Sequence, residues 1–164
     1  MTAEPAGRSA GVHPRGGHVT KPTLASRQAA LVAALVAGAP VPQGFDERLV
    51  GVAEQALRRK RAGQVAAVWP HLAASLGDSW TDHFSRWARG RPTKGGLRDG
   101  WDMARELALL GELPPLGVAE LAMREVTVRY DGRTAPRPRR CPALRVVPGG
   151  VVLGVFGRAY RLGG

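Results

Sequence analysis

The sequence is short of cysteine, aromatic residues and long apolar runs. Its single cysteine, Cys141, excludes a disulfide within the chain, and a cytosolic protein is the simplest interpretation. Aromatic residues make up 5% of the chain, so we expect them to anchor the core. No run is long enough to span a bilayer. Residues 29–37, AALVAALVA, resemble the apolar part of a secretory signal, but their late position and the adjoining Arg27 favour a buried helix.

Patterns typical of catalytic or metal sites are also missing. His13 and His18 lie in the N-terminal tail, whereas His71 and His83 fall in different predicted helices. None has the spacing of a metal site or of a nucleophile and its base. The basic loop at 89–98 contains glycines but lacks the GKS or GKT ending of a phosphate-binding loop. The sequence therefore predicts no metal, no cofactor and no enzyme activity.

The positive charge is large and unevenly placed. The formal net charge is +11, with 21 arginines and only 3 lysines, which suggests an acidic or nucleic-acid partner. Residues 24–130 carry 14 basic and 11 acidic residues, a net +3, whereas residues 131–164 carry seven arginines against Asp131, a net +6. Because a DNA reader usually concentrates arginine along one recognition helix, this placement makes DNA the less favoured partner.

Residues 57–91 hold the clearest pattern, including three of the four tryptophans. Their apolar positions recur every three or four residues, as in helices with one buried face. Proline suits the first turn of a helix and glycine suits its end, so Pro70 and Gly77 divide the run. The predicted structural core here is Trp69, Pro70, Leu72, Leu76, Gly77, Trp80, Phe84 and Trp87. The basic run at 58–61 is interpreted as a solvated collar, or alternatively as an anchor for an acidic peptide or phosphate.

Helix signals outside this stretch complete a predicted bundle of about six helices. Ser26, Asp46 and Asp99 are candidate N-caps, and the first helix is apolar nearly all round, which predicts burial. The second helix carries a predicted buried stripe of Leu49, Val52, Ala53, Ala56, Val65 and Val68. The expected helices cover 26–37, 47–69, 70–76, a segment ending near residue 88, 99–110, and 115 to about 130.

The fold predicted from these signals is mainly α, a compact bundle followed by a small C-terminal β-meander. Residues 1–23 are too polar and too rich in Gly and Pro to fold and are expected to be disordered. Residues 24–130 form the helical domain, and residues 131–142 form an extended Pro/Arg linker in which Cys141 is exposed. Residues 143–164 read as two or three short strands, which must pack on the helices or pair with another chain.

The order of these segments resembles a known family. A helix beginning RQAALVAALVAG, then VAAVWPHLAASLGDSWTDHFSRWA, then LPPLGVAELAMREVTVRYDG, is similar to the helical domain of accessory subunits of multinuclear non-haem iron-dependent oxidative (MNIO) enzymes. That domain has been labelled a DNA-binding domain. The family pattern is met by Trp69-Pro70, Leu72, Leu76-Gly77 and Trp80, and the tail resembles the short C-terminal module of actinobacterial members.

This resemblance implies a non-catalytic partner subunit without iron of its own. It would bind a ribosomally made precursor peptide and present it to an iron enzyme that oxidises peptide cysteines in natural-product (RiPP) biosynthesis. A helical DNA-binding protein is the alternative. We expect a cytoplasmic protein with no membrane contact, whose exposed strand edges accept or donate a strand. The expected partner- or peptide-binding residues are Arg58, Arg59, Arg61, Arg145, Val151, Val152, Phe156 and Tyr160.

Overall fold

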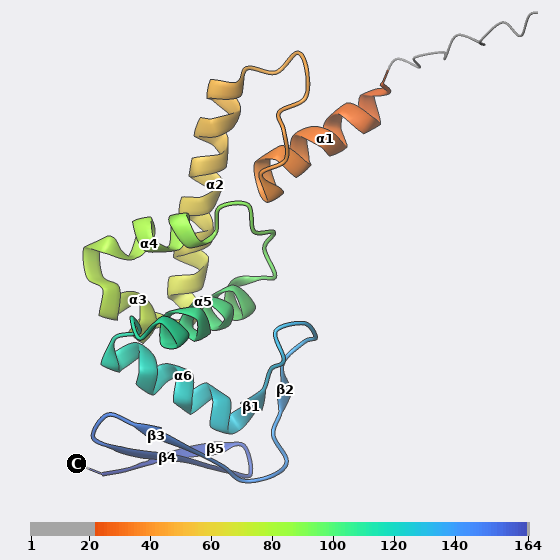
Figure 1. Ribbon diagram of the computed structural model, residues 1–164. Coiled ribbons are helices and arrows are strands. Elements are labelled where there is room, and N and C mark those ends of the chain that lie inside the picture. Colours follow the sequence, from red (N-terminus) through yellow and green to blue (C-terminus); the bar gives the residue numbers. More distant parts are fainter. Residues whose placement is uncertain (1–21, 164) are drawn as a thin grey trace, which may run out of the picture.

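A computed structural model describes residues 22–163, so the tail predicted over 1–23 lies almost entirely outside the described residues. The chain is mainly α with a small β region at its C-terminal end, as the sequence predicts (Figure 1). The helices are α1 (Leu24–Ala37), α2 (Glu47–Val68), α3 (Pro70–Leu76), α4 (Trp80–Trp87), α5 (Gly96–Leu110) and α6 (Pro115–Thr127), with a 3-10 turn at Gly77–Ser79. The strands are β1 (Val128–Arg129), β2 (Arg137–Pro138), β3 (Ala143–Val147), β4 (Gly150–Val155) and β5 (Arg158–Leu162).

Local chemistry fixes most helix ends. The Asp46 carboxylate accepts the backbone N–H groups of Arg48 and Leu49, so it caps α2 as predicted. The cap of α1 is Thr23, because its hydroxyl accepts the backbone N–H of Ser26. The prediction that Ser26 is itself the N-cap was therefore wrong. At the other end Gly38 adopts φ 68°, the left-handed conformation that closes a helix at low cost for glycine.

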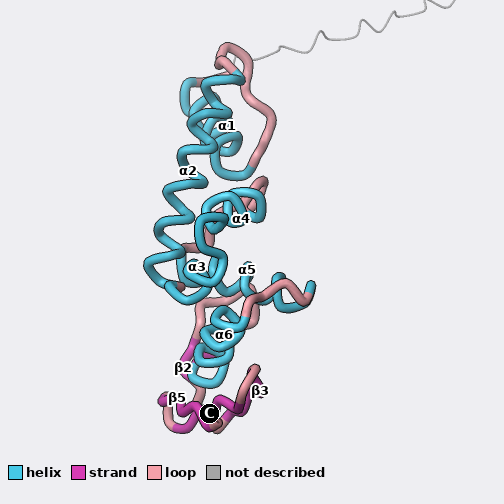
Figure 2. Tube along the Cα trace, turned by 90° about the vertical axis from the view of Figure 1, so that its left-hand side faces the viewer, coloured by secondary structure: helices cyan, strands magenta, loops and turns pink. Residues whose placement is uncertain are grey.

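The helices do not form one compact bundle, and that part of the prediction was wrong. The N-terminal half of α2 extends beyond the other helices with α1 beside it, and the sheet lies at the opposite end of the molecule (Figures 1 and 2). Between these ends, α2 to α5 surround one hydrophobic core with α6 at its lower side. The molecule is therefore elongated, with a two-helix arm at one end and a sheet at the other.

The hydrophobic core is built around tryptophan. Trp69 and Trp101 are 0% and 1% exposed, and their rings meet edge to face with centroids 5.8 Å apart. The Trp69 indole N–H donates to the carbonyl of Leu97 at 3.0 Å. A side chain at Gly100 would collide with the Trp69 indole, so only glycine lets α5 approach this closely. Leu72, Trp80 and Phe84 complete this centre as predicted, with Leu76 and Trp87 packed at its edge.

Two residues that were predicted to lie in the core mark the ends of helix α3 instead. Pro70 and Gly77 are exposed, so their assignment to the core was wrong. Pro70 is the first residue of α3, where its missing N–H costs nothing. Gly77 ends that helix with φ 53°. Both residues shape the chain path around Trp69 without contributing buried surface.

A pair of charged residues on α6 holds the junction between α2 and α3. Trp69, at the N-terminus of α3, provides no side-chain cap. Instead, the buried Glu120 carboxylate accepts the backbone N–H of Leu72 at 2.8 Å, while Arg124 donates to the carbonyl of Val68 and to Glu120. The Arg124 guanidinium also lies 4.2 Å from the Trp69 ring centroid. A residue pair four positions apart thus satisfies backbone groups at the ends of two other helices.

The predicted burial of the first two helices was partly wrong. Ala34 is the buried residue of α1, whereas Leu24, Val32 and Val36 are exposed. On α2, Val65 is buried but Leu49 and Val52 are 66% and 61% exposed. Ala53, Ala56 and Val68 are exposed as well, and the buried positions are Val50, Ala62 and Val65. The apolar positions in the first half of α2 therefore mark a face that nothing among the described residues covers.

Two further boundaries differ from the sequence prediction. Helix α5 begins at Gly96, so Asp99 is inside the helix and not its N-cap. Helix α6 ends at Thr127, because Val128 and Arg129 pair with β2, antiparallel, in the register Val128↔Pro138. The β-branched residues at this end thus favour a strand. The predicted linker at 131–142 accordingly contains strand β2, and Cys141 within it is exposed as predicted.

The C-terminal meander is confirmed as an antiparallel sheet of order β3-β4-β5. It packs on α6 through a second, smaller hydrophobic cluster made by Ala122, Val126, Val147 and Val152. A side chain at Gly154 would collide with the backbone of Val126, so this glycine lets strand β4 lie directly against the helix. Within residues 22–163 no helix combines the length and apolar character needed to cross a membrane.

Candidate interaction surface

Among the described residues no three His, Cys, Asp or Glu side chains are grouped as metal ligands. His71 lies on α3 and His83 on α4, in separate helices as the sequence indicates. The features that remain are surfaces: the basic run on α2, the two faces of the C-terminal sheet, and the arginines around β1 and β2.

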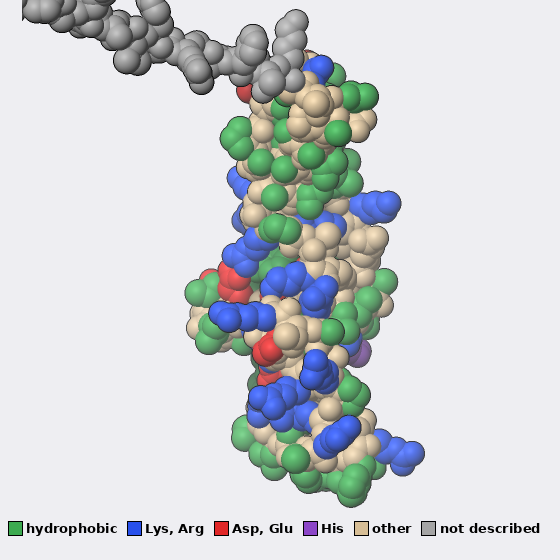
Figure 3. All heavy atoms as spheres, turned by 90° about the vertical axis from the view of Figure 1, so that its right-hand side faces the viewer, with side chains coloured by type: hydrophobic (Ala, Val, Ile, Leu, Met, Phe, Trp, Pro, Cys, Tyr) green, Lys and Arg blue, Asp and Glu red, His purple; other side chains and the backbone are tan. Residues whose placement is uncertain are grey.

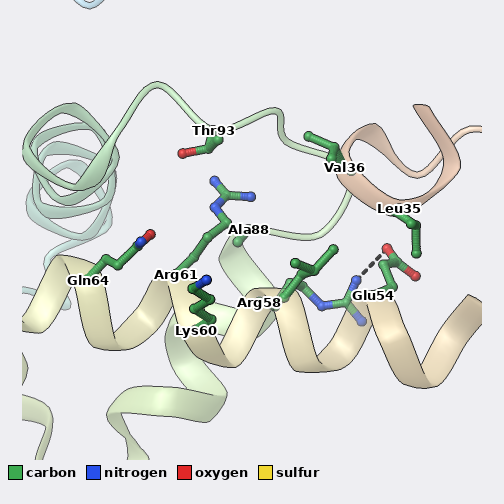
Figure 4. Close-up of a pocket in the computed structure, with 11 residues that line it drawn as sticks. Leu35, Val36, Glu54, Arg58, Lys60, Arg61, Gln64, Ala88 and Thr93 are labelled. Atoms are coloured by element: carbon green, nitrogen blue, oxygen red, sulfur yellow. Dashed lines mark ion pairs between the residues drawn. The ribbon is translucent and has the colours of Figure 1, made fainter. Parts of the chain in front are cut away.

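Two of the four basic residues in the run on α2 are neutralised within the chain. The Arg61 guanidinium donates to the Asp99 carboxylate at 3.1 Å and to the carbonyl of Arg91 at 2.9 Å, and both side chains of this ion pair are buried. Arg58 pairs with Glu54 one turn earlier on the same helix. Figure 4 shows Arg58 directed along α2 toward Glu54 and Arg61 directed toward the loop that carries Thr93. Arg58 and Arg61 therefore do not point together as an anchor.

Asp99 explains why Arg61 is buried. Its carboxylate also accepts the Thr93 hydroxyl at 2.7 Å and the backbone N–H of Lys94 at 2.8 Å. The pair thus fastens the loop between α4 and α5 to the middle of α2. The adjacent cleft is small, about 230 Å³, and its lining includes Leu35, Val36, Leu57 and Lys60 (Figure 4). Arg59 and Lys60 remain exposed on α2.

The two faces of the C-terminal sheet differ in what covers them. The register Arg145↔Val152↔Arg161 places these three residues on the inner face, toward α6. Val152 is 0% exposed, so its assignment to a partner surface was wrong. The opposite side, which we call the outer face, comprises Leu144, Val146, Val151, Leu153, Val155, Arg158, Tyr160 and Leu162.

The outer face is apolar over all three strands. Val146 is 79% exposed, and Leu144, Tyr160 and Leu162 are about half exposed. Figure 3 shows apolar side chains gathered at the lower end of the molecule, where Figure 1 places the sheet. An antiparallel sheet with one solvated face normally alternates apolar and polar residues. Strands that are apolar on both sides, as VVLGV in β4 is, are typical of sheets covered on both faces.

Phe156 lies at the edge of the outer face in a strained turn. It is 92% exposed and has φ 50°, the one non-glycine residue with positive φ among those described. Gly157 follows with φ 76°, so the β4–β5 turn has two consecutive positive φ angles, a geometry that favours Asn-Gly. A bulky residue at such a position costs about 1–2 kcal/mol. The folding of the described chain therefore gives no reason for a phenylalanine at this position.

A shared carboxylate ties the sheet to the helices. Glu125 on α6 accepts Arg105 from α5 at 2.7 Å and Arg145 from β3 at 3.1 Å. Burial alone would raise the pKa of Glu125, but the hydrogen bonds and charges of the two arginines outweigh it, and the pKa lies below its usual value. Arg145 therefore has a structural partner, and its predicted role in partner binding is not supported by its position.

A groove separates the inner edge of the sheet from the helices. Its volume is about 530 Å³, and its lining includes Leu116 and Met123 of α6 and Ala159 and Arg161 of β5. Strand β5 is an edge of the sheet, so no strand among the described residues pairs with its outer side. His71 and Arg124 stand at the groove wall.

The arginines of the former linker gather around β1 and β2. Arg129 and Arg137 are direct cross-strand partners, and both are exposed. Asp131 between them is engaged by backbone, since it accepts the N–H groups of Arg133 and Thr134, which lower its pKa to about 2. Like charges directly opposite on a ladder are unfavourable, so the exposed pair Arg129 and Arg137 does not stabilise the hairpin.

The predicted partner residues thus separate into three groups. Val151 and Tyr160 lie on the outer face with Phe156 beside them, and Arg59 is exposed at a distance on α2. In the third group Val152 is buried, and Arg58, Arg61 and Arg145 form ion pairs within the chain, with Arg145 still exposed. The outer-face residues Leu144, Val146 and Leu162 were missed by sequence reasoning. The sequence shows that these residues alternate with Arg145 and Arg161 along the strands. Which of the two alternating sets faces α6 depends on the tertiary packing.

Comparison with known proteins places the helical part of the chain in a family. Residues 25–109, from α1 to near the end of α5, match the family described as SCO6045-like, C-terminal domain, and the chain belongs to this family. A UPF0276 protein of Streptomyces avermitilis is 43% identical over 124 residues, which cover 75% of this chain and 25% of that protein. The chain therefore spans about a quarter of the length of this curated relative. No solved structure matches the chain.

Proposed function

We propose that this chain is a non-catalytic partner module that docks on a larger polypeptide through the outer face of its C-terminal sheet. The observation that carries the proposal is the exposed apolar outer face with Phe156 at its edge. Apolar patches of this kind on a folded surface are typical of protein interfaces, and exposed aromatic residues are common binding hot spots.

The charge of the module defines the chemistry of its partner. Residues 132–164 contain no acidic residue, while Arg158 lies on the outer face. The surface that covers the outer face is therefore an apolar patch with carboxylates at its rim, because these would pair with the arginines. A second copy of the same sheet would bring arginine toward arginine and is disfavoured.

The family comparison supports a module beside a larger body, and the resemblance supplies the class of partner. The Streptomyces avermitilis relative carries its matching quarter within a much longer chain, which is the arrangement expected of a module that works beside a larger body. From the resemblance to MNIO accessory subunits, the larger body is an iron-dependent oxidative enzyme. The module binds this enzyme, its ribosomally made precursor peptide in RiPP biosynthesis, or both. The free edge of β5 is available for such a peptide.

The test is a pull-down with the tagged full chain from its native host, followed by titration against the purified enzyme it recovers. The expected result is an enzyme that contains iron by metal analysis, and whose affinity falls at least tenfold with Phe156→Asp. Leu109→Asp is the matched control, since Leu109 is 88% exposed on α5, away from the sheet. Equal binding by both variants, or recovery of no such enzyme, would contradict the proposal.

Deletion of residues 143–164 gives a second test. The sheet has its own small cluster on α6, separate from the main core. We therefore expect the truncated chain to keep its helical circular dichroism and a cooperative melt while losing the partner. If truncation unfolds the helices, the sheet serves the fold and the docking role must be assigned elsewhere.

A second candidate function is DNA binding, favoured by one observation. The arginines of β1 and β2, including the facing pair Arg129 and Arg137, form an exposed basic surface with Asp131 already engaged by backbone. This function predicts binding to duplex DNA that weakens steeply between about 50 and 200 mM salt, and a smaller salt slope for the double variant Arg129→Gln/Arg137→Gln. Absence of binding to duplex DNA at low salt would remove this candidate.

A further inference from the structure

The exposed stripe of α2 has the features of a helix-pairing surface. Leu49, Val52, Ala53 and Ala56, which we call the α2 stripe, repeat at helical spacing and are all exposed. Two turns further, Gly63 has open space where its side chain would be. A helix with small residues along one side can be approached closely by another helix. Nothing in residues 22–163 packs on this side of α2.

We propose that the α2 stripe binds the α2 stripe of a second copy of this chain, with the two helices antiparallel and Ala53 at the two-fold axis. Charge complementarity favours a second copy of the chain as the partner of the stripe. Asp46 precedes the stripe and Lys60 follows it, each seven residues from Ala53, which is about 10 Å along a helix. Two-fold symmetry therefore places Asp46 of each copy opposite Lys60 of the other, twice in one interface.

The groups involved are free for this role. Asp46 is exposed and uses its Oδ1 atom to cap α2, and a carboxylate has two oxygens that accept hydrogen bonds. Lys60 is exposed and has no ion-pair partner within 22–163, unlike Arg58 and Arg61 beside it. Leu49 of each copy would face Ala56 of the other, a large residue against a small one, which allows close packing.

The pairing leaves the proposed partner surface free. The N-terminal half of α2 and the C-terminal sheet lie at opposite ends of the molecule (Figure 1). A dimer formed through the arm would therefore present two outer faces pointing away from each other. Each copy could dock its own partner, so the assembly would be bivalent and gain avidity for any target that carries two sites.

The first measurement is the mass of the full chain in solution across a concentration series, by light scattering after size-exclusion chromatography. The expected result is a concentration-dependent shift from the 17.4 kDa monomer to twice that mass. Ala53→Glu should raise the dissociation constant at least tenfold, because it buries two like charges at the axis. Val32→Glu is the matched control on α1, where Val32 is 57% exposed outside the stripe, and it should leave the dimer intact.

A cross-linking experiment tests the register. In a Cys141→Ser background, Ala53→Cys should form a disulfide-linked dimer rapidly under mild oxidation, because the two-fold axis brings the two Cβ atoms together. Gln55→Cys, exposed on the other side of α2, is the control and should cross-link slowly. A monomer at every concentration, or equal cross-linking at both positions, would overturn the proposal. Neither outcome bears on binding of a partner at the sheet.

Discussion

The helical core and the C-terminal sheet are both built from apolar side chains, but they differ in how many of their sides are covered. Trp69, Leu72 and Phe84 are completely enclosed by neighbouring helices. In the sheet, Val152 on the inner face is equally buried, whereas Val146 on the outer face is 79% exposed. The difference teaches that apolar content alone does not separate a fold-stabilising position from a binding position. Whether a neighbouring element covers an apolar position decides which of the two it is.

The largest expected loss of stability comes from removing one partner of the buried ion pair in the helical region. Arg61→Ala leaves the Asp99 carboxylate buried without its cation, and removal of one partner of a buried pair typically costs about 3–5 kcal/mol. Both side chains of the pair are at least 87% buried, since they are 13% and 3% exposed. Urea unfolding followed by circular dichroism measures the loss. The control is Arg59→Ala on the exposed side of α2, for which a comparable loss would refute the assignment.

A second substitution should separate the two regions. Gly154→Ala forces a side chain into the backbone of Val126, so the sheet must move away from α6. We expect a destabilisation of about 1–3 kcal/mol that is confined to the sheet, measured as faster amide hydrogen exchange in β3 and β4 with unchanged protection in α5. Uniform loss of protection over the whole chain would show that sheet and helices unfold as one unit.

The link between the two regions should depend on pH. The folded pKa of Glu125 is below its usual value of 4.5 because Arg105 and Arg145 outweigh burial. A lowered folded pKa means that the ionised carboxylate contributes stability above about pH 4.5, and that this contribution is lost as the pH falls through the folded pKa. Glu125→Gln should remove that acid-side dependence and cost about 1–2 kcal/mol at pH 7. Parallel stability curves against pH for both proteins would contradict this.

The smallest expected change in stability is an increase, and it comes from a substitution that should weaken binding of the partner. Phe156→Asn replaces a strained aromatic residue by one that tolerates positive φ before Gly157. We expect the variant to be more stable by about 1 kcal/mol and yet to bind the partner at least tenfold more weakly. Thermal melting and titration against the partner enzyme give the two numbers. A variant that loses stability would show that Phe156 serves the fold.

The sequence predicted the elements better than their environment. Spacing, Pro70, Gly77 and Asp46 located α2 to α4 to within a residue or two, because these signals act through nearby backbone. The ends of α5 and α6 were displaced, since Asp99 binds Arg61 from another helix and Val128 pairs with Pro138. Of the residues predicted to bind a partner, Val151, Phe156 and Tyr160 lie on or beside the outer face, whereas Val152 is buried and Arg145 pairs with Glu125.

What the sequence by itself determined is local. Helix periods, caps, turns and the change from helical to strand pattern after residue 142 follow from the conformational preferences of neighbouring residues. What only the tertiary structure decided is which apolar faces are covered. Leu49 and Val65 belong to the same predicted stripe of α2, yet one is 66% exposed and the other is fully buried. Burial depends on residues far away in the chain, here α5 for Val65. No described residue covers the apolar faces at the arm and on the outer side of the sheet.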